Sequence, residues 1–482
     1  MSIMIQGTGS NVGKSMLVAG LARALHLRGF NVSPFKPQNM SNNAAVTADG
    51  GEIGRAQALQ AIASHKPAHT DMNPVLLKPE TTTGSQVVVQ GKRLASVKAK
   101  DYAALKPTLM KHVLESFNRL KATSDIVLVE GAGSPAEINL RAGDIANIGF
   151  AEAARVPIIL AGDIDRGGVI AQIVGTHVIL PDNDKNLIKA FMINKFRGDP
   201  DLFTDGYKAI SDRTGWTGLG VVPWFKDAHL LPAEDSMDIK SAGDGPLKIV
   251  VPQLSRIANF DDLDPLKTEP NVQVVMLPAG RAIPGDTDLV ILPGSKSTIA
   301  DFNYVREQGW DIDIKAHVQR GGRVLGICGG YQMLGTTLAD PDGIEGTPSI
   351  SEGLGLLDVK TVMTPHKTLS EVQGQTHPDD VPFEGYEIHI GETTGPDCEH
   401  GWLKIDGKRV GASRTDGLIH GAYVHGIFAS DQFRRHYLNS LGVEASNRSY
   451  SETVDQTLNA LAEHIEKYVD VDAVLEIARK GV

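Results

Sequence analysis

A glycine-rich segment near the N-terminus stands between a short apolar run and a helical pattern. The apolar run covers residues 2–6, and the helical pattern extends from residue 13 to about residue 28. Backbone N–H groups of such a turn, at a helix N-terminus, form an anion site, to which lysine adds charge and serine a Mg²⁺-binding hydroxyl. The segment therefore predicts a parallel α/β domain that binds the phosphates of ATP. Its candidate binding residues are Thr8, Asn11, Gly13, Lys14 and Ser15.

This loop departs from the strict phosphate-loop pattern at one position. The pattern has a glycine five residues before Gly13, whereas this chain has Thr8 there and Gly7 just ahead of it. A tight strand-to-helix turn without a ligand is the alternative interpretation. The preceding strand and the following helix favour nucleotide binding, because they supply the geometry that the site requires.

Length and composition narrow the range of functions. A chain of 482 residues is too long for one hydrophobic core, so we expect two or more domains. Two cysteines, Cys328 and Cys398, cannot form a disulfide framework, so a reducing cytoplasm is expected. The net charge of -11 argues against a nucleic-acid partner, which requires a basic face. No apolar run reaches the roughly 18 residues of a membrane span, so no membrane partner is expected.

Short apolar runs alternate with helical patterns, which is typical of βαβ units and mostly parallel sheets. The small, polar segment 240–246 predicts a linker. We therefore expect two α/β domains, residues 1–240 and 247–482, the second ending in a helix over about 454–479. The expected strands are 2–6, 31–34, 126–129, 157–161, 190–193 and 218–222 in the first domain, and 247–251, 272–277, 289–292 and 324–327 in the second.

Carboxylates that emerge beside the phosphate loop are the candidate Mg²⁺ ligands, together with Ser15. Glu130 ends the apolar run 126–129, so it should lie at the same sheet edge as Lys14. Asp49, in a turn that contains Gly50 and Gly51, is a second candidate. The alternatives are a solvated strand end for Glu130 and an ordinary turn aspartate for Asp49.

Asn194 follows another apolar run and is a candidate for reading the base of the nucleotide. A guanine site of the Asn-Lys-x-Asp type would require an acid at position 197, where this chain has Arg197. We therefore expect adenine, with the Asn194 amide meeting its exocyclic amine. A cap at the end of the strand is the alternative role for Asn194.

The second domain carries a candidate nucleophile on a sharp turn. Gly326-x-Cys328-x-Gly330 follows an apolar run and has the form of a nucleophile elbow, in which glycines flank a residue exposed between a strand and a helix. A helix N-terminus favours the thiolate form of a cysteine. His425, behind another short apolar run, is the candidate base. The alternatives are a buried structural cysteine and a core histidine.

An attack on an amide also requires donors for the tetrahedral oxyanion. The backbone N–H groups around Gly329 and in the turn at Gly294 are the candidates. The other cysteine, Cys398, lies in a polar loop beside Asp397 and Glu399, and we interpret it as a bystander.

Many segments, in order along nearly the whole chain, resemble the cobyric acid synthases, which are glutamine-dependent amidotransferases of cobalamin biosynthesis. The first half is similar to the dethiobiotin synthetase type of P-loop domain, and the second half to a class I glutamine amidotransferase. The segments that carry the resemblance are 7–15, 34–40, 49–57, 72–79, 129–135, 163–168, 259–263, 292–298, 326–332, 385–389 and 425–428.

The resemblance implies amidation of the b, d, e and g carboxylates of adenosylcobyrinic acid a,c-diamide, with ATP, Mg²⁺ and either glutamine or ammonia. The family nucleophile corresponds to Cys328 and its histidine to His425. One position departs from the wider amidotransferase class, which has glutamate two residues after the histidine, where this chain has Ile427. The sequence leaves open what orients His425, which route ammonia takes, and in which order the four carboxylates react.

The resemblance also singles out four residues for binding or activation of the substrate. Lys36 lies in the segment 34–40, and Asp144 is placed where a substrate-facing acid would be useful. Asp163 and Arg166 lie in the segment that follows the strand expected at 157–161, where the backbone of that segment and Arg166 are positioned to meet substrate carboxylates. Plain turn chemistry is the alternative for Asp144 and for the loop of Asp163 and Arg166.

Three other functions remain as alternatives at this point. The first is the sibling enzyme that amidates the a and c carboxylates of the same ring; the segments 34–40 and 72–79 favour the cobyric acid branch. The second is a P-loop switch ATPase with a degenerate amidotransferase tail, which intact Cys328 and His425 disfavour. The third is a cysteine hydrolase, in which an ATP site would be idle.

Overall fold

The computed structural model describes residues 1–80, 84–232 and 241–482, which fold into two compact units. The first unit comprises residues 1–41, 47–231 and 454–482, and the second comprises 42–46 and 232–453. This division differs from the predicted one at the end of the chain, because residues 454–482 belong to the first unit. Lys240, the first residue of the predicted linker, lies outside the described residues.

The first unit is built on a six-stranded sheet in which every neighbouring pair is parallel. Except for the edge strand β12, its strands are almost completely buried, as expected for a sheet with helices on both faces. All six strands expected from the sequence are present. In spatial order they are β12 (Thr217–Pro223), β11 (Ile188–Phe196), β10 (Ile158–Asp163), β1 (Ser2–Gly7), β9 (Ile126–Glu130) and β2 (Val32–Phe35).

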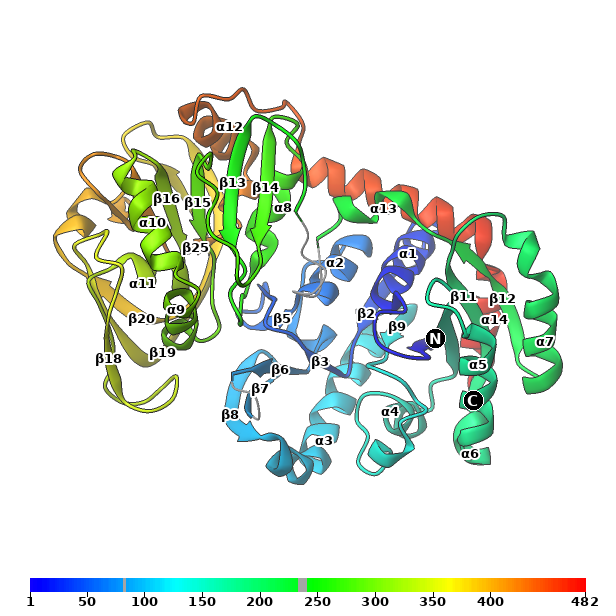
Figure 1. The fold of residues 1–482 in the computed structure, drawn as a ribbon. Coiled ribbons are helices and arrows are strands. Elements are labelled where there is room, and N and C mark those ends of the chain that lie inside the picture. The colour runs from blue at the N-terminus through cyan, green and yellow to red at the C-terminus, as the bar shows by residue number, and fades with distance from the viewer. Residues whose placement is uncertain (81–83, 233–240) are drawn as a thin grey trace. The chain divides into compact units, whose positions relative to one another are not determined.

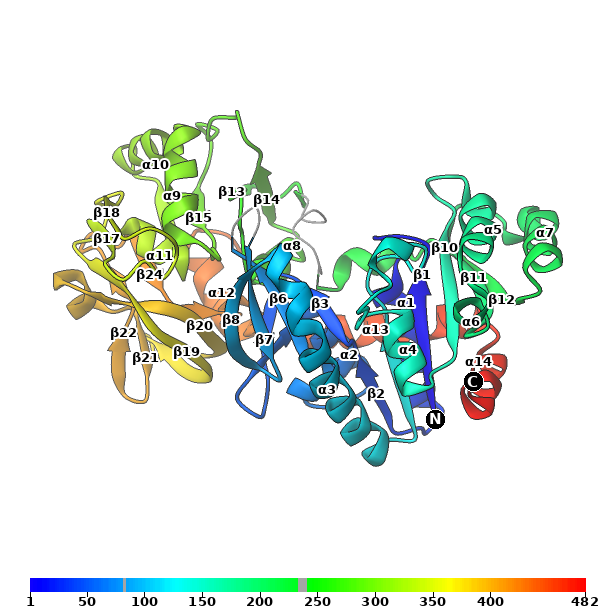
Figure 2. The same ribbon diagram turned by 90° about the horizontal axis from the view of Figure 1, so that it is seen from below.

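Helices pack on both faces of this sheet. Figure 2 shows α5 (Val169–Ile179) and α7 (Thr204–Thr214) on one face of β10–β12 and α14 (Val471–Lys480) on the other. A small second sheet joins β3 (Gln38–Met40) to the three strands from β6 to β8. The remaining elements of this unit are β5 (Glu52–Gly54), β6 (Val75–Pro79), β7 (Gly84–Val89), β8 (Lys92–Lys98), α1 (Lys14–Leu27), α2 (Arg55–Ala63), α3 (Ala99–Thr123), α4 (Ile148–Ala154), α6 (Asp182–Lys185) and the 3₁₀ helices Thr70–Met72, Ile138–Leu140, Pro200–Phe203 and Lys226–Leu230.

The single C-terminal helix expected from the sequence is two helices, α13 (Tyr450–Tyr468) and α14, with a break at Asp470. The Asp470 side chain accepts a hydrogen bond from Ala473 N and caps α14. Figure 1 shows both helices, in red, beside α1 and the first sheet. Buried Arg23 of α1 donates to Asn459 Oδ1 at 2.8 Å and pairs with Asp455 at 2.7 Å, so polar contacts fix α13 to α1.

The second unit contains a mostly parallel sheet in which four adjacent strands, from one edge inwards, were predicted from the sequence. The same unit contains a second, largely antiparallel sheet, whose longest strands are the hairpin of β19 and β20. This hairpin was not predicted, because its polar and apolar residues follow no clear period. The first sheet runs β14 (Val272–Leu277), β13 (Leu247–Pro252), β15 (Leu289–Leu292), β16 (Arg323–Ile327), β24 (Ile419–Ala422) and β23 (Ala412–Ser413). The second contains β18 (Ser349–Glu352), β17 (Thr337–Asp340), β19 (Lys360–Thr376), β20 (Pro382–Thr394), β25 (Val424–His425), β21 (Leu403–Ile405) and β22 (Lys408–Val410).

The helices of the second unit surround its parallel sheet. They are α8 (Asp264–Lys267), α9 (Thr298–Glu307), α10 (Trp310–Gln319), α11 (Gly329–Leu334) and α12 (Asp431–Ser440), with 3₁₀ helices at Phe260–Leu263, Pro396–His400 and Ile427–Ala429; the short strand β4 (Ala44–Val46) also belongs to this unit. Across the described part of the chain, no helix is both long and apolar enough to cross a membrane.

Replacement of Gly220 tests how closely the C-terminal segment packs on β12. Gly220 has φ 140°, and an added Cβ would lie 1.9 Å from Tyr468 O. Gly29 is a matched control, because it has φ 89° and its Cβ would meet nothing within 4 Å. We expect Gly29→Ala to lower the free energy of unfolding by about 1 kcal/mol through backbone strain. Gly220→Ala should cost a further ~1–3 kcal/mol from overpacking. Equal losses in urea unfolding would contradict this packing.

Candidate functional sites

The predicted phosphate loop connects β1 to α1, and its conformation depends on residues with positive φ. Gly13 has φ 92° and Asn11 has φ 59°. Lys14 Nζ donates to Gly9 O at 3.0 Å and to Gly133 O at 3.3 Å, so it reaches both this loop and the segment after β9. The lysine charge is thereby held over the N-terminus of α1, where an anion is favoured.

Hydrogen bonds to the ends of two neighbouring strands, β11 and β10, hold the phosphate loop in place. The Asn194 amide donates to Val12 O at 2.8 Å, and a Cβ on Gly13 would lie 2.4 Å from the same amide nitrogen. Thr8 N donates to Ala161 O at 2.9 Å, next to the end of β10. Asn194 thus holds the loop, which corresponds to the strand-end cap named above as its alternative role. Only a residue without a side chain fits beside it at position 13.

Glu130, at the end of β9, is the centre of a buried polar network beside the loop. Its Oε1 accepts hydrogen bonds from Ser15 Oγ at 2.9 Å and from Lys36 Nζ at 2.7 Å, and its Oε2 accepts from Gln60 Nε2 at 2.5 Å. Glu130 and Lys36 are 1% and 5% exposed. Burial alone would raise the pKa of Glu130, but the nearby Lys36 and Lys14 charges and these hydrogen bonds lower it. The carboxylate is therefore ionised in a dry environment.

The Ser15 hydroxyl and the Glu130 carboxylate suit Mg²⁺, which prefers a few hard oxygen ligands together with water. Lys36 shares the same carboxylate oxygen as Ser15. Asp49 is placed differently: its carboxylate accepts hydrogen bonds from Thr70 N at 3.2 Å and Thr70 Oγ1 at 2.6 Å, as a turn aspartate does. Within residues 1–80, 84–232 and 241–482, no group of three or more His, Cys, Asp or Glu is arranged to hold a metal ion.

Asp144 organises backbone in the segment that precedes α4. Its Oδ1 accepts hydrogen bonds from Ala146 N at 2.8 Å and Asn147 N at 3.0 Å, and its Oδ2 accepts from Gly149 N at 2.9 Å. Asn147 Oδ1 in turn accepts from Ala132 N at 3.0 Å, in the loop that follows Glu130. Asp144 therefore shapes the edge of the phosphate site through the backbone.

Asp163 and Arg166 occupy the loop after β10. Asp163 is 5% exposed, pairs with Lys195 Nζ at 3.1 Å and accepts a hydrogen bond from Asp165 N at 2.9 Å. The Lys195 ammonium also donates to Asn11 O, so Asp163 is connected to the phosphate loop. Arg166 is exposed to solvent.

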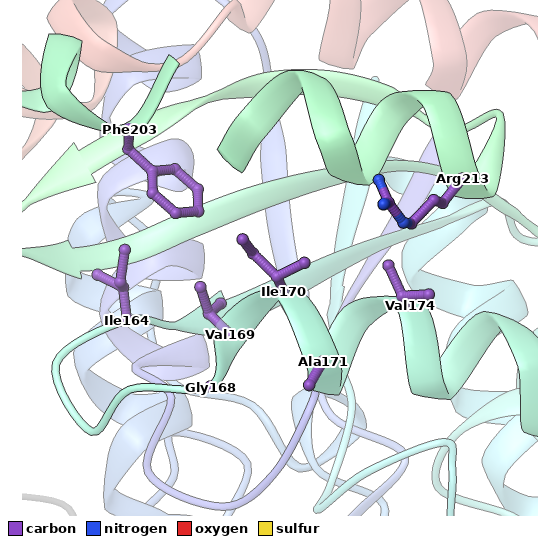
Figure 3. Close-up of a pocket in the computed structure, with 8 residues that line it drawn as sticks. All are labelled: Ile164, Gly168, Val169, Ile170, Ala171, Val174, Phe203 and Arg213. Carbon is purple, nitrogen blue, oxygen red and sulfur yellow. The ribbon is translucent and has the colours of Figure 1, made fainter. Parts of the chain in front are cut away.

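An open, mainly apolar pocket of about 480 Å³ begins at this loop (Figure 3). Ile164 and Phe203 lie at one end of it, and Arg213 of α7 lies at the other. Val169, Ile170 and Val174 of α5 line the space between them. The pocket is separate from the Glu130 network, none of whose residues lines it.

In the second unit, Cys328 occupies the turn between β16 and α11 with φ 53° and ψ −109°. The flanking glycines are required by close packing: a Cβ on Gly330 would lie 1.9 Å from Leu292 O, and one on Gly326 would lie 2.7 Å from the Gly330 backbone. Cys328 is 7% exposed, and its Sγ lies 3.7 Å from Ile388 O. A strained, glycine-flanked position of this kind presents a nucleophile to substrate.

The two predicted oxyanion segments lie next to each other beside this cysteine. A Cβ on Gly329 would lie 2.9 Å from Ser295 N, and one on Gly294 would lie 2.8 Å from His425 Cε1. Buried Asp301 holds the Gly294 turn, because it accepts hydrogen bonds from Ser295 Oγ at 2.6 Å and Ser255 Oγ at 2.5 Å. The cysteine turn, the Gly294 turn and His425 therefore form one site.

The residue that sequence reasoning missed is Asp262, in the 3₁₀ helix Phe260–Leu263. His425 Nδ1 donates to Asp262 Oδ2 at 2.8 Å, and Gly426 N donates to Asp262 Oδ1 at 2.5 Å. Burial lowers the pKa of His425, but the charges of Asp262 and Cys328 outweigh it and raise the pKa to about 10. The only sequence signal was the pair Asp261-Asp262 in a segment that carries the family resemblance.

Strand β20 supplies the remaining polar groups around His425. The Tyr386 ring is stacked on the imidazole, with centroids 5.3 Å apart and planes at 19°. His389 stacks on Tyr423 at 3.7 Å, and burial lowers the pKa of His389 to about 4, so it is neutral at pH 7.

Cys398 is half-buried, with its Sγ 3.7 Å from the Tyr331 hydroxyl, and burial raises its pKa.

A phosphate loop on a parallel sheet, followed by a cysteine elbow with a histidine, defines a nucleotide-binding unit and a glutamine amidotransferase unit in one chain. Residues 3–239 match the CobQ/CobB/MinD/ParA nucleotide binding domain, and residues 248–433 match the CobB/CobQ-like glutamine amidotransferase domain.

Full-length relatives then identify the family. The chain is 62% identical to the cobyric acid synthases of Jannaschia sp. (strain CCS1), Ruegeria sp. (strain TM1040) and Rhodobacter capsulatus. The alignments cover 99%, 98% and 99% of this chain and 99%, 98% and 100% of the three relatives. The chain therefore belongs to the cobyric acid synthase family.

Proposed function

We propose that this enzyme uses ATP and glutamine to amidate the b, d, e and g carboxylates of adenosylcobyrinic acid a,c-diamide, giving adenosylcobyric acid. The observation that carries the proposal is that one chain of this family holds both a buried Ser15–Glu130–Lys36 network at the phosphate loop and Cys328 with His425 in one site. The first arrangement suits phosphoryl transfer, and the second suits release of ammonia from an amide.

Activation of the carboxylate is assigned to the first unit. A carboxylate repels nucleophiles and lacks a leaving group, so one of its oxygens attacks the γ-phosphorus of ATP while the bond to ADP breaks. The product is an acyl phosphate. Catalysis of such a step is mostly positioning and charge neutralisation, for which Lys14 and the loop N–H groups are suited. Lys36 is placed to neutralise the substrate carboxylate or the transferred group. Mg²⁺ held by Ser15 and Glu130 would neutralise charge on the phosphates.

Ammonia release is assigned to the second unit. The Cys328 thiolate attacks the side-chain carbonyl carbon of glutamine, and the electron pair moves onto oxygen, where N–H groups near Gly329 and Gly294 stabilise it. When the intermediate collapses, the C–N bond breaks and His425 protonates the departing nitrogen. Water then hydrolyses the thioester to glutamate. Ammonia attacks the acyl phosphate, phosphate departs, and the amide forms after loss of a proton.

Mass spectrometry of the reaction product tests the proposal directly. With the a,c-diamide, ATP, Mg²⁺ and glutamine, we expect four carboxylates to become amides, with one ADP formed per amide. The same incubation without ATP should give no amide. Conversion of the a and c carboxylates of the unamidated ring, with no reaction of the diamide, would instead indicate the sibling enzyme.

Replacement of Cys328 separates the two chemistries. We expect Cys328→Ala to abolish glutamine-supported amidation, because no thioester forms, while amidation with concentrated ammonia at alkaline pH continues. Cys398→Ala is the matched control and should retain both activities, since Cys398 lies outside the site. Amide formation is measured with each nitrogen source. Loss of both activities in a folded Cys328→Ala protein would contradict the division of labour.

Replacement of Lys14 or Glu130 should reduce amidation with both nitrogen sources. Lys14→Ala should lose amidation with glutamine and with ammonia by about 10²-fold or more, because charge neutralisation of the transferred phosphoryl group is lost. Glu130→Gln should also lose both, with partial recovery at raised Mg²⁺. Alkylation of Cys328 serves as the control and should be retained in each variant. A normal ammonia-dependent rate would remove that residue from the proposed activation site.

A further inference from the structure

The position that carries glutamate in the wider amidotransferase class holds Ile427 in this chain, and its side chain is 3% exposed. A buried isoleucine cannot accept a hydrogen bond from an imidazole. His425 itself is fully buried. An imidazolium in this environment requires another negative partner, because an unpaired buried charge is strongly disfavoured.

We propose that Asp262 is the positioning residue for His425 in the release of ammonia, and that it replaces the missing glutamate from a different part of the chain. This inference rests on the proposed function of Cys328 and His425. Asp262 is 2% exposed and its Oδ2 lies 2.8 Å from His425 Nδ1. Its other oxygen accepts a hydrogen bond from Gly426 N at 2.5 Å, so the carboxylate holds both the ring and the backbone beside it.

The bond to Nδ1 determines which nitrogen is left for chemistry. A carboxylate that accepts from Nδ1–H fixes the tautomer and the ring orientation, so that Nε2 faces the reacting groups. His425 Nε2 is buried and no hydrogen bond of ordinary length fixes it among the described residues, whereas the Cys328 thiol is close enough to raise the pKa of His425. Nε2 is therefore available to exchange a proton with Cys328 and with the departing ammonia.

Asp262 is itself held by its own segment. Asn259, at the start of this 3₁₀ helix, has φ 51°, and its side chain accepts a hydrogen bond from Ala44 N at 3.2 Å. Ala258 N donates to Gly294 O at 2.9 Å, which links the segment to the predicted oxyanion turn. The neighbouring Asp261 accepts a hydrogen bond from the Tyr386 hydroxyl at 3.3 Å, and Tyr386 stacks on His425. The segment 258–262 thus contacts three parts of the site.

Glu387 is the competing acid. It lies on β20 near enough to His425 that the imidazolium lowers its pKa, although burial raises that pKa overall. The other titratable groups that face His425 are Cys328, from the cysteine turn, and neutral His389 and Tyr386, from β20. Asp262 is favoured over Glu387 because it forms a hydrogen bond to the ring.

The test compares Asp262→Asn with the native enzyme in three assays. Glutamine-dependent kcat should fall by about 10²- to 10⁴-fold, the usual contribution of a positioned acid–base group, with little change in KM for glutamine. Ammonia-dependent amidation should be unchanged. In the native enzyme, the rate of Cys328 alkylation by iodoacetamide should vary little from pH 6.5 to about 10, because His425 stays protonated between its ordinary and its raised pKa. In Asp262→Asn, the alkylation rate should be low at neutral pH and rise with pH.

Two further variants make the result decisive. Asp262→Glu restores a carboxylate and should recover part of the glutamine-dependent rate and the flat alkylation profile. Glu387→Gln removes the competing acid, and the proposal is overturned if this variant, rather than Asp262→Asn, changes the profile. It is also overturned if Asp262→Asn loses rate only in proportion to its folded fraction, with the native profile. Cys328→Ala run alongside reports separately on the proposed function, since glutamine-dependent activity in that variant would refute the nucleophile itself.

Discussion

Both units place their chemistry where parallel strands end, and this constraint decides which residues can meet. In a parallel sheet every strand has its carboxyl end at the same edge, so residues that follow different strands lie side by side although they are distant in sequence. The phosphate loop follows β1, Glu130 ends β9, and Asp163 ends β10. In the second unit, the Gly294 turn follows β15 and Cys328 follows β16. Neighbouring strand ends therefore form the framework of each site, and helical residues such as Ser15 and Asp262 complete it.

Burial of charge is the second common feature of the two sites. Glu130 with Lys36 and Asp262 with His425 are pairs of opposite charge that are almost completely removed from water. Such pairs contribute little net stability, because desolvation offsets most of their attraction. Their effect is to hold charged groups in place before the substrate arrives, so that little reorganisation is needed during the reaction. Loss of one partner leaves the other as an unpaired buried charge.

The sequence was sufficient for the parts of the fold that depend on local pattern. The six predicted strands of the first parallel sheet and the four predicted strands of the second are confirmed, because apolar runs bounded by turn residues and alternating with helical patterns are typical of such sheets. The long β19–β20 hairpin was not predicted, since its polar and apolar residues follow no clear period. The placement of 454–482 also failed, because an amphipathic helix does not reveal which sheet it will cover.

The candidate site residues also differ in whether the sequence alone could identify them. Glycine spacing marked Cys328 and the phosphate loop, because close packing and positive φ require glycine there. Asp262 could not be found by spacing, since it lies 163 residues from His425 and only the folded chain brings them together. For Asn194, the hydrogen bond to Val12 O depends on the register of β11 beside the loop, which the sequence does not reveal.

The return of the chain to its first unit has a consequence for synthesis on the ribosome. Residues 454–482 cover the sheet that begins at Ser2, and buried Arg23 obtains its partners Asn459 and Asp455 only from that segment. Domains generally fold as units while the chain emerges from its N-terminus. Here the nucleotide-binding unit remains incomplete until every residue of the amidotransferase unit has been made. A chain truncated anywhere in the second unit would leave Arg23 without these two partners and α1 without the Leu461 and Ile465 side chains that pack on it.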